Sequence, residues 1–185
     1  MRIRAVGDSI TFGQHLPFGV PAWPERIGAT GRGVCGETTR QALERFPRDV
    51  QDDPADITVL QWAHNDCNRW DSDRGLPRVS LEAFRANLVE MIHRCRTFGT
   101  TPALVTPTPT RTTAAYDEDL IEYSCAVASV GTHWGVHVID VREAFYGSGR
   151  LSELLMSDGL HLSSEGHQVY ANVVENALVR AQVAA

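Results

Sequence analysis

Four short polar motifs contain the residue types that nucleophilic catalysis needs. They read Gly7-Asp8-Ser9-Ile10, Gly36-Glu37-Thr38, Ala63-His64-Asn65-Asp66 and Asp158-Gly159-Leu160-His161. A serine hydroxyl is a weak nucleophile until a base takes its proton, and histidine is the side chain best suited to that role near neutral pH. We therefore interpret Ser9 as the candidate nucleophile and His161 as its candidate base.

The spacing of the last motif predicts a partner for the base. Asp158 precedes His161 by three residues, so the two side chains can meet within one turn of chain. The carboxylate can then hold one ring nitrogen as a donor, which leaves the other nitrogen free to accept a proton. Ser9, Asp158 and His161 form the predicted catalytic set.

Two further motifs offer donors for the oxyanion that forms when a hydroxyl attacks a carbonyl group. The side-chain amide of Asn65 can donate to a developing negative charge, and Gly36 allows its backbone N–H to approach a substrate closely. The backbone N–H of Ser9, at a turn after a strand, is the third candidate. The predicted oxyanion hole is thus Ser9, Gly36 and Asn65.

Each motif taken alone also fits a plain turn. Asp8 can cap a turn, Asn65-Asp66 is a common turn pair, and Asp158 with His161 fits a surface turn. The joint occurrence of all four motifs in this order favours catalysis.

The four motifs together resemble the GDSL family, also called SGNH hydrolases. The resemblance runs from residue 7 to beyond residue 161 and implies a flavodoxin-like fold with a serine esterase site. Two positions depart from the family pattern, because Ala63 replaces a glycine and Glu37 stands where the family often has aspartate. We expect both departures to affect the shape of the pocket and not the reacting groups.

The pattern of apolar residues predicts the elements that position these motifs. Expected strands cover residues 2–6, a very short segment at Val34, and residues 57–63, 103–106 and 136–141. Expected helices cover residues 38–50, 81–95, 120–134 and a segment through residue 178, with Ser80 and Ser163 as N-caps of the second and the last.

Alternating strands and helices predict an α/β fold, a three-layer α/β/α sandwich around a five-stranded parallel sheet. No linker or repeat divides the chain, so residues 1–185 are expected to form a single domain. Ligands of such sheets lie beyond the carboxyl ends of the strands, and the polar motifs follow strands as this rule requires.

Other polar or aromatic residues near the motifs are candidates for the substrate lining. They are Asp8, His64, Trp70, Thr106 and Pro107. Trp70 lies in a long polar segment, residues 68–74, of the kind that often shapes specificity, and it fits sugar stacking or packing on the domain edge equally well.

Composition excludes several functional classes. The net charge of −6 gives no basic surface for nucleic acid, and no apolar run is long enough to span a membrane. The N-terminal segment does not resemble a secretion signal, so a cytoplasmic location is expected. The four cysteines form no C-x-x-C pair, and we expect neither a metal nor an organic cofactor.

The expected activity is hydrolysis of a small-molecule ester with a short acyl group through an acyl-enzyme on Ser9, including removal of acetyl groups from carbohydrate. Thioester or lysophospholipid cleavage and acyl transfer to an alcohol use the same residues and stay open as alternatives. A flavodoxin-like binding module without catalysis is a further alternative, which the joint presence of Ser9, Asn65, Asp158 and His161 disfavours. The sequence does not specify the oligomeric state.

Overall fold

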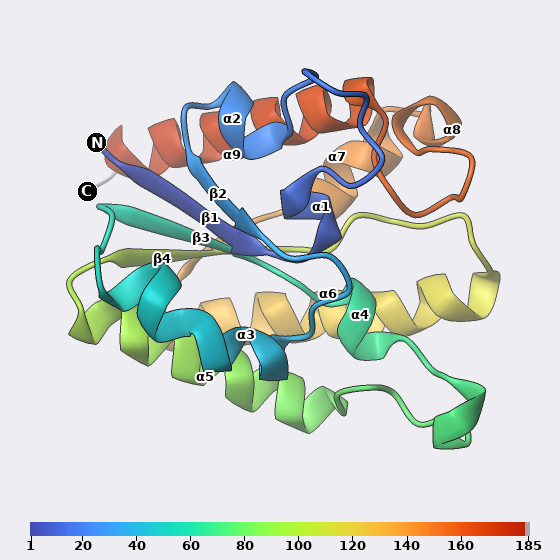
Figure 1. The fold of residues 1–185 in the computed structure, drawn as a ribbon, viewed down its shortest axis with the longest axis horizontal. Coiled ribbons are helices and arrows are strands. Elements are labelled where there is room, and N and C mark those ends of the chain that lie inside the picture. Colours follow the sequence, from blue (N-terminus) through green and yellow to red (C-terminus); the bar gives the residue numbers. More distant parts are fainter. Residues whose placement is uncertain (184–185) are drawn as a thin grey trace.

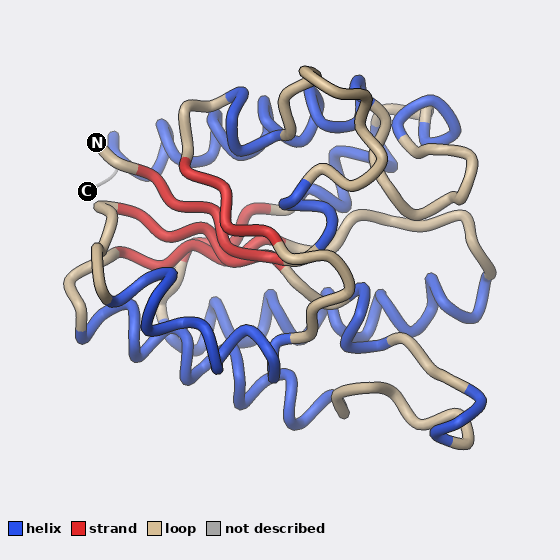
Figure 2. Tube along the Cα trace, viewed as in Figure 1, coloured by secondary structure: helices blue, strands red, loops and turns tan. Residues whose placement is uncertain are grey.

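A five-stranded parallel sheet forms the centre of the molecule (Figures 1 and 2). The structure, a computed structural model, describes residues 1–183. The sheet has the order β2-β1-β3-β4-β5. Its strands are β1 Ile3–Gly7, β2 Thr30–Gly33, β3 Ile57–Gln61, β4 Thr101–Val105 and β5 His137–Ile139.

Helices cover both faces of this sheet (Figure 1). One face carries α1 Ser9–Phe12, α2 Trp23–Arg26, α7 Val141–Gly147, α8 Leu151–Leu154 and α9 Ser164–Val183. The other carries α3 Thr39–Phe46 with the π-helical turn Pro47–Gln51, α4 His64–Cys67, α5 Leu81–Thr97 and α6 Ala114–Trp134. A short 3₁₀ turn, Asp71–Asp73, lies in the segment between α4 and α5. This arrangement is the predicted three-layer sandwich.

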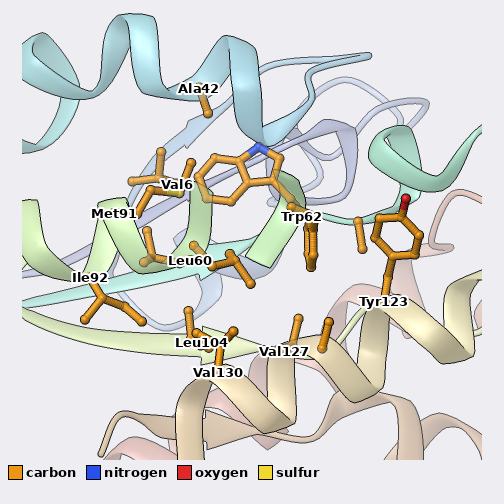
Figure 3. Packing of buried hydrophobic residues seen from close by; sticks show 14 of the residues in the cluster. Val6, Ala42, Leu60, Trp62, Met91, Ile92, Leu104, Tyr123, Val127 and Val130 are labelled. Carbon is orange, nitrogen blue, oxygen red and sulfur yellow. The ribbon is translucent and has the colours of Figure 1, made fainter. Parts of the chain in front are cut away.

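Alternation along the strands divides the core into two apolar clusters. Leu60 and Leu104 point to the side of α3, α5 and α6, whereas their neighbours Val59 and Ala103 point to the side of α2, α7 and α9. Trp62 is buried among the side chains of the first cluster (Figure 3). Both faces of the central strands are therefore buried, as a parallel sheet between helical layers requires.

The predicted N-caps of α5 and α9 are confirmed. The Ser80 hydroxyl accepts from the backbone N–H of Ala83 at 3.3 Å, and the Ser163 hydroxyl accepts from that of Gly166 at 3.0 Å. Helix α6 begins earlier than expected, at Ala114, with Thr113 as its cap. None of its residues before Leu120 is buried, which is why the apolar period does not reveal its start.

The prediction of the second strand was wrong in position. The strand is Thr30–Gly33, with the sequence TGRG, and Val34 lies just beyond it with its N–H bonded to the Gly7 carbonyl at 3.0 Å. β2 is an edge strand and its residues are mostly exposed, so it lacks the apolar run that reveals the other strands.

Of the helices in residues 1–183, none combines the length and the apolar character that crossing a membrane requires.

Candidate active site

Ser9 lies at the junction of β1 and α1. The strand ends at Gly7, Asp8 caps the helix by accepting the N–H of Ile10 at 2.9 Å, and Ser9 is the first helical residue. Its side chain is largely buried, with a relative exposure of 6%. The sequence thus fixes the hydroxyl at the carboxyl end of the first strand, where the fold places ligands.

The tertiary structure brings the three predicted catalytic residues into one chain of hydrogen bonds. His161 Nε2 is 3.1 Å from Ser9 Oγ, and His161 Nδ1 is 2.7 Å from Asp158 Oδ2. The serine and the histidine are 152 residues apart in sequence. The order of groups is nucleophile, base and carboxylate, which is the arrangement that activates a serine hydroxyl.

The surroundings of Asp158 lower its pKa and so keep its carboxylate charged. Partial burial acts to raise its pKa, but hydrogen bonds from the His161 ring and from the backbone N–H groups of Leu160 and His161 prevail and lower it to about 2. Both backbone bonds end on Oδ1, at 2.9 and 3.0 Å. Oδ2 is therefore left to hold His161 Nδ1–H.

Asn65 presents the side-chain donor that the sequence predicts for the oxyanion. It lies in α4, directly after β3, and its Nδ2 atom is buried with no hydrogen-bond partner in residues 1–183. A buried amide nitrogen without a partner costs free energy, so such a group is unusual unless a ligand satisfies it.

Gly36 lies on an exposed turn after β2, with φ of +75°. Its carbonyl accepts a hydrogen bond from the Arg78 guanidinium at 2.9 Å, which fixes the orientation of the peptide. The next residue, Glu37, is buried and binds Arg45 through both carboxylate oxygens and the Trp62 indole N–H at 3.3 Å. The glutamate that replaces the family's aspartate thus anchors this turn to the core.

Two buried contacts hold α4 in place. Asp66 Oδ1 accepts from the backbone N–H of Thr39 at 2.9 Å and from its hydroxyl at 2.5 Å. The Tyr116 hydroxyl donates to the His64 carbonyl at 2.5 Å. The residues on both sides of Asn65 are therefore tied to α3 and α6, which gives its side chain a fixed origin.

Ala63 adopts a backbone conformation that favours glycine. Its φ is +118° and its ψ is −36°, and it is fully buried just before α4. An alanine in this region is strained because its Cβ collides with the backbone. The positive φ explains why the family has glycine at this position. This protein adopts the same turn with alanine and bears the backbone strain.

Replacing Ala63 by glycine is expected to change the free energy of unfolding by between about −0.8 and about +1.8 kcal/mol, which is centred on a small gain. Relief of strain gains roughly 1–3 kcal/mol, while the lost methyl group costs about 0.8 and the freer unfolded chain about 0.4–1 kcal/mol. Urea denaturation measures the change. The matched control is Ala42→Gly in α3, another buried alanine, which should lose about 2 kcal/mol. Equal losses in the two variants would show that Ala63 is unstrained.

Asp8 and His64, two predicted lining residues, are buried parts of the scaffold. Burial raises the pKa of Asp8 to about 7, against the opposing hydrogen bond from the Ile10 N–H, and the side chain serves as a helix cap. Burial lowers the pKa of His64 to about 3, so the ring is neutral, and its Nε2 lies 3.1 Å from the Thr108 hydroxyl. Both side chains are buried.

Thr106 and Pro107 also lie in the interior. The Thr106 hydroxyl donates to Asp140 at 2.9 Å and accepts from the Arg142 N–H at 3.2 Å. Both residues are buried, as Ser9 and His161 are. A run of threonines and prolines is typical of a surface loop. In this protein the threonine hydroxyls form hydrogen bonds with neighbouring segments.

Trp70 is half exposed on the segment after α4. The Arg78 guanidinium lies 4.5 Å from the centre of its ring. The surface cavity that it borders is lined by Thr38, Arg40, Gln41, Trp70, Asp73, Leu76, Pro77 and Arg78, and by none of the three predicted catalytic residues.

The sequence motifs missed several residues that border or support the site. Thr110 donates to the Gly159 carbonyl at 2.8 Å and so fixes the turn that carries Asp158 and His161. His15 packs edge-on against His161, with ring centres 4.8 Å apart. Neither residue belongs to a recognisable motif, and only the fold brings them to the site.

Comparison with known proteins gives one family. Residues 5–169 match the model of the GDSL-like Lipase/Acylhydrolase family. The chain is 25% identical over 197 aligned positions to the isoamyl acetate-hydrolyzing esterase 1 homolog of Bos taurus, covering 90% of this chain and 77% of that protein. It is 38% identical over 77 residues to the uncharacterized lipoprotein YqeF of Bacillus subtilis (strain 168), covering 42% of this chain but only 31% of that protein.

Solved structures share the fold at low sequence identity. A lipase/acylhydrolase from Enterococcus faecalis superimposes with a TM-score of 0.80 at 24% identity, covering 94% of this chain and 93% of its own. The acetylxylan esterase Axe2 from Geobacillus stearothermophilus gives a TM-score of 0.81 at 18% identity, covering 95% and 93%.

Proposed function

The chain belongs to the GDSL-like Lipase/Acylhydrolase family and is a carboxylic ester hydrolase, and from this premise we propose that it cleaves esters of small acyl groups through an acyl-enzyme on Ser9. One observation carries the proposal, the continuous chain of hydrogen bonds from Ser9 Oγ through the His161 ring to Asp158. These hydrogen bonds connect the motif that contains Ser9, near the N-terminus, to the motif that contains Asp158 and His161, near the C-terminus.

In the first half of the reaction, Ser9 Oγ attacks the ester carbonyl carbon while His161 Nε2 takes the hydroxyl proton. Asp158 holds Nδ1–H and stabilises the imidazolium that forms. The C–O bond of the ester then breaks, the imidazolium gives its proton to the departing alcohol, and the acyl group stays on Ser9. Water attacks this acyl-enzyme with His161 again as base, and the acid leaves.

Negative charge on the carbonyl oxygen is stabilised by three donors. These are the backbone N–H groups of Ser9 and Gly36 and the Asn65 amide. The unpartnered, buried Nδ2 of Asn65 supports this role, because the oxyanion supplies the partner that the protein withholds.

Asn65→Ala is expected to lower kcat by roughly 10²–10³-fold, the usual cost of removing one oxyanion donor. The fold should persist, since no partner of Asn65 Nδ2 in the described residues is lost. Initial rates with p-nitrophenyl acetate and the circular dichroism spectrum measure the two quantities. Asn172→Ala, at an exposed position of α9, is the matched control and should stay within a few-fold of the unchanged protein. A similar small effect at both positions would remove Asn65 from the oxyanion hole.

A cavity beside the site has a mainly apolar lining and can accept an acyl group. It has a volume of about 390 Å³ and is bordered by Leu160, the neighbour of His161, and by Tyr116. An ion pair between Arg69 and Asp119, at 2.7 Å, also lines it. A long alkyl chain placed there would remove this pair from water without replacing its hydration, which is unfavourable. The bovine relative's name, which refers to isoamyl acetate, agrees with a short acyl group.

A panel of p-nitrophenyl acetate, butyrate and octanoate tests the substrate class. We expect kcat/KM to be highest for acetate or butyrate and lowest for octanoate. A preference for octanoate would contradict the short-chain assignment while leaving the role of Ser9 intact. No turnover of any ester by folded protein would contradict the proposed reaction itself.

A further inference from the structure

Three side chains with metal-binding groups meet next to the nucleophile. They are His15, Asp158 and His161, and one ligand atom from each lies within 4.8 Å of the other two. The rings of His15 and His161 meet edge to face, at an interplanar angle of 88°. Two of these residues belong to the proposed catalytic set, whereas the proposed reaction gives His15 no role.

We propose that His15, Asp158 and His161 bind a divalent zinc ion and that the bound ion switches the hydrolase off. Two imidazoles and one carboxylate are a ligand set that zinc accepts, whereas calcium and magnesium prefer oxygen ligands alone. The site takes the ion as a reversible inhibitor. It goes beyond the ester hydrolysis proposed above, which needs no metal.

The distances allow the site to close on an ion with small movements. Tetrahedral zinc with bonds of about 2.0–2.1 Å needs ligand atoms roughly 3.3 Å apart. His15 and Asp158 are exposed, so their side chains can rotate, while His161 is fixed by the Asp158 turn and Ser9. Three protein ligands leave a fourth position for water or for the Ser9 hydroxyl.

The backbone conformation of His15 positions its ring beside the His161 ring. His15 follows α1 in a left-handed conformation with φ of +71°, which non-glycine residues adopt infrequently. The Gln14 side chain lies 3.2 Å from His15 Nε2. The His15 ring therefore lies beside the His161 imidazole, and rotation of its exposed side chain can bring a ring nitrogen to a shared ion.

Binding of an ion at either nitrogen of His161 stops the proposed reaction. An ion on Nε2 takes the lone pair that must accept the Ser9 proton. An ion on Nδ1 takes the lone pair of that nitrogen, so the ring proton lies on Nε2, which can then no longer accept the proton of Ser9. In both cases the serine hydroxyl keeps its proton and is a weak nucleophile.

Binding is measured first without turnover, in Ser9→Ala, which keeps all three ligands. Titration calorimetry with Zn²⁺ should show one ion per chain, and Co²⁺ should give the visible absorption of tetrahedral coordination. In Ser9→Ala/His15→Asn the affinity should fall by at least about tenfold, because groups that only support a ligand already contribute that much. Asparagine is chosen since it tolerates the left-handed backbone at this position. Ser9→Ala/His137→Asn, which replaces an exposed histidine at the opposite end of the sheet, should bind as Ser9→Ala does.

Inhibition is measured next in protein with Ser9 intact, each variant being compared with its own metal-free rate. Zn²⁺ should inhibit p-nitrophenyl acetate hydrolysis, excess EDTA should restore it, and His15→Asn should raise the half-inhibiting concentration at least about tenfold. Unchanged zinc affinity in the His15 variants, or equal inhibition of the His15→Asn and His137→Asn proteins, would overturn the proposed site. Absence of zinc binding by Ser9→Ala would do the same whether or not the protein hydrolyses esters, so the two proposals fail independently.

Discussion

Ser9→Ala is expected to lower kcat/KM for p-nitrophenyl acetate by roughly 10⁴–10⁶-fold, the range that loss of a serine nucleophile costs in comparable hydrolases. The reason is geometric. Ser9 Oγ is the group that His161 Nε2 faces at 3.1 Å, and alanine leaves the base with no hydroxyl to deprotonate. The oxyanion donors and the binding surface persist, so a small residual rate should survive.

The same variant distinguishes chemistry from folding. Ser9 is small, and its recorded side-chain hydrogen bond is the one to His161, so the thermal unfolding midpoint should change little. A fluorophosphonate probe should label the unchanged protein and fail to label Ser9→Ala. Ser152→Ala, which alters an exposed serine of α8, is the matched control and should be labelled normally. Labelling of folded Ser9→Ala, or retained turnover, would refute the assignment of the nucleophile.

Asp158→Asn is expected to lower kcat by roughly 10²–10⁴-fold although the side chain keeps its shape. The Oδ1 atom accepts the N–H groups of Leu160 and His161, so the oxygen of asparagine will stay there. The amide nitrogen must then face His161 Nδ1. Because that nitrogen is a donor, Nδ1 becomes an acceptor, the ring proton moves to Nε2, and Nε2 can no longer take the proton of Ser9.

The alternative is that Asp158 has only a structural role. If Asp158 only stabilised the turn, asparagine would keep both backbone bonds and the activity would remain within a few-fold. Asp158→Ala removes the backbone bonds as well, so only the alanine variant should lower the unfolding midpoint noticeably. Asp52→Asn, at an exposed position beyond the π-helical turn, is the control for a change of charge.

The lowered pKa of Asp158 has a consequence for pH dependence. Its folded-state pKa of about 2 is below the value of about 3.9 for an unperturbed aspartate. The stability that its hydrogen bonds contribute is therefore complete above pH of about 4 and is lost as the pH falls through about 2. We expect activity lost between pH 7 and 5 to have a cause other than protonation of Asp158, because its carboxylate stays charged over that interval, and an NMR titration of the Asp158 carboxyl carbon checks this.

The fold was predictable where sequence periodicity reflects burial. Strands β1, β3 and β4 read as nearly continuous apolar runs because helices cover both faces of the sheet. Helices α5 and α9 showed their apolar stripes and their serine caps. β2 was misplaced because an exposed edge strand of glycine, threonine and arginine carries no such signal.

The candidate chemistry was predictable for a different reason. Ser9 follows β1 and Asn65 follows β3, and parallel strands end at one edge of the sheet, so the motifs meet once the topology is known. Asp158 and His161 are close in sequence, and their contact is local. The sequence by itself therefore predicted the proposed reacting residues and their order.

Only the tertiary structure decided what surrounds them. Asp8, His64 and Thr106 are polar residues in or near the motifs, but packing buries them, and each forms a hydrogen bond inside the protein. His15 lies 146 positions before His161 and reaches it through a loop whose path no local pattern specifies. The types of residue that react are fixed by local motifs, whereas exposure and long-range contact are properties of the packed chain and appear only when it folds.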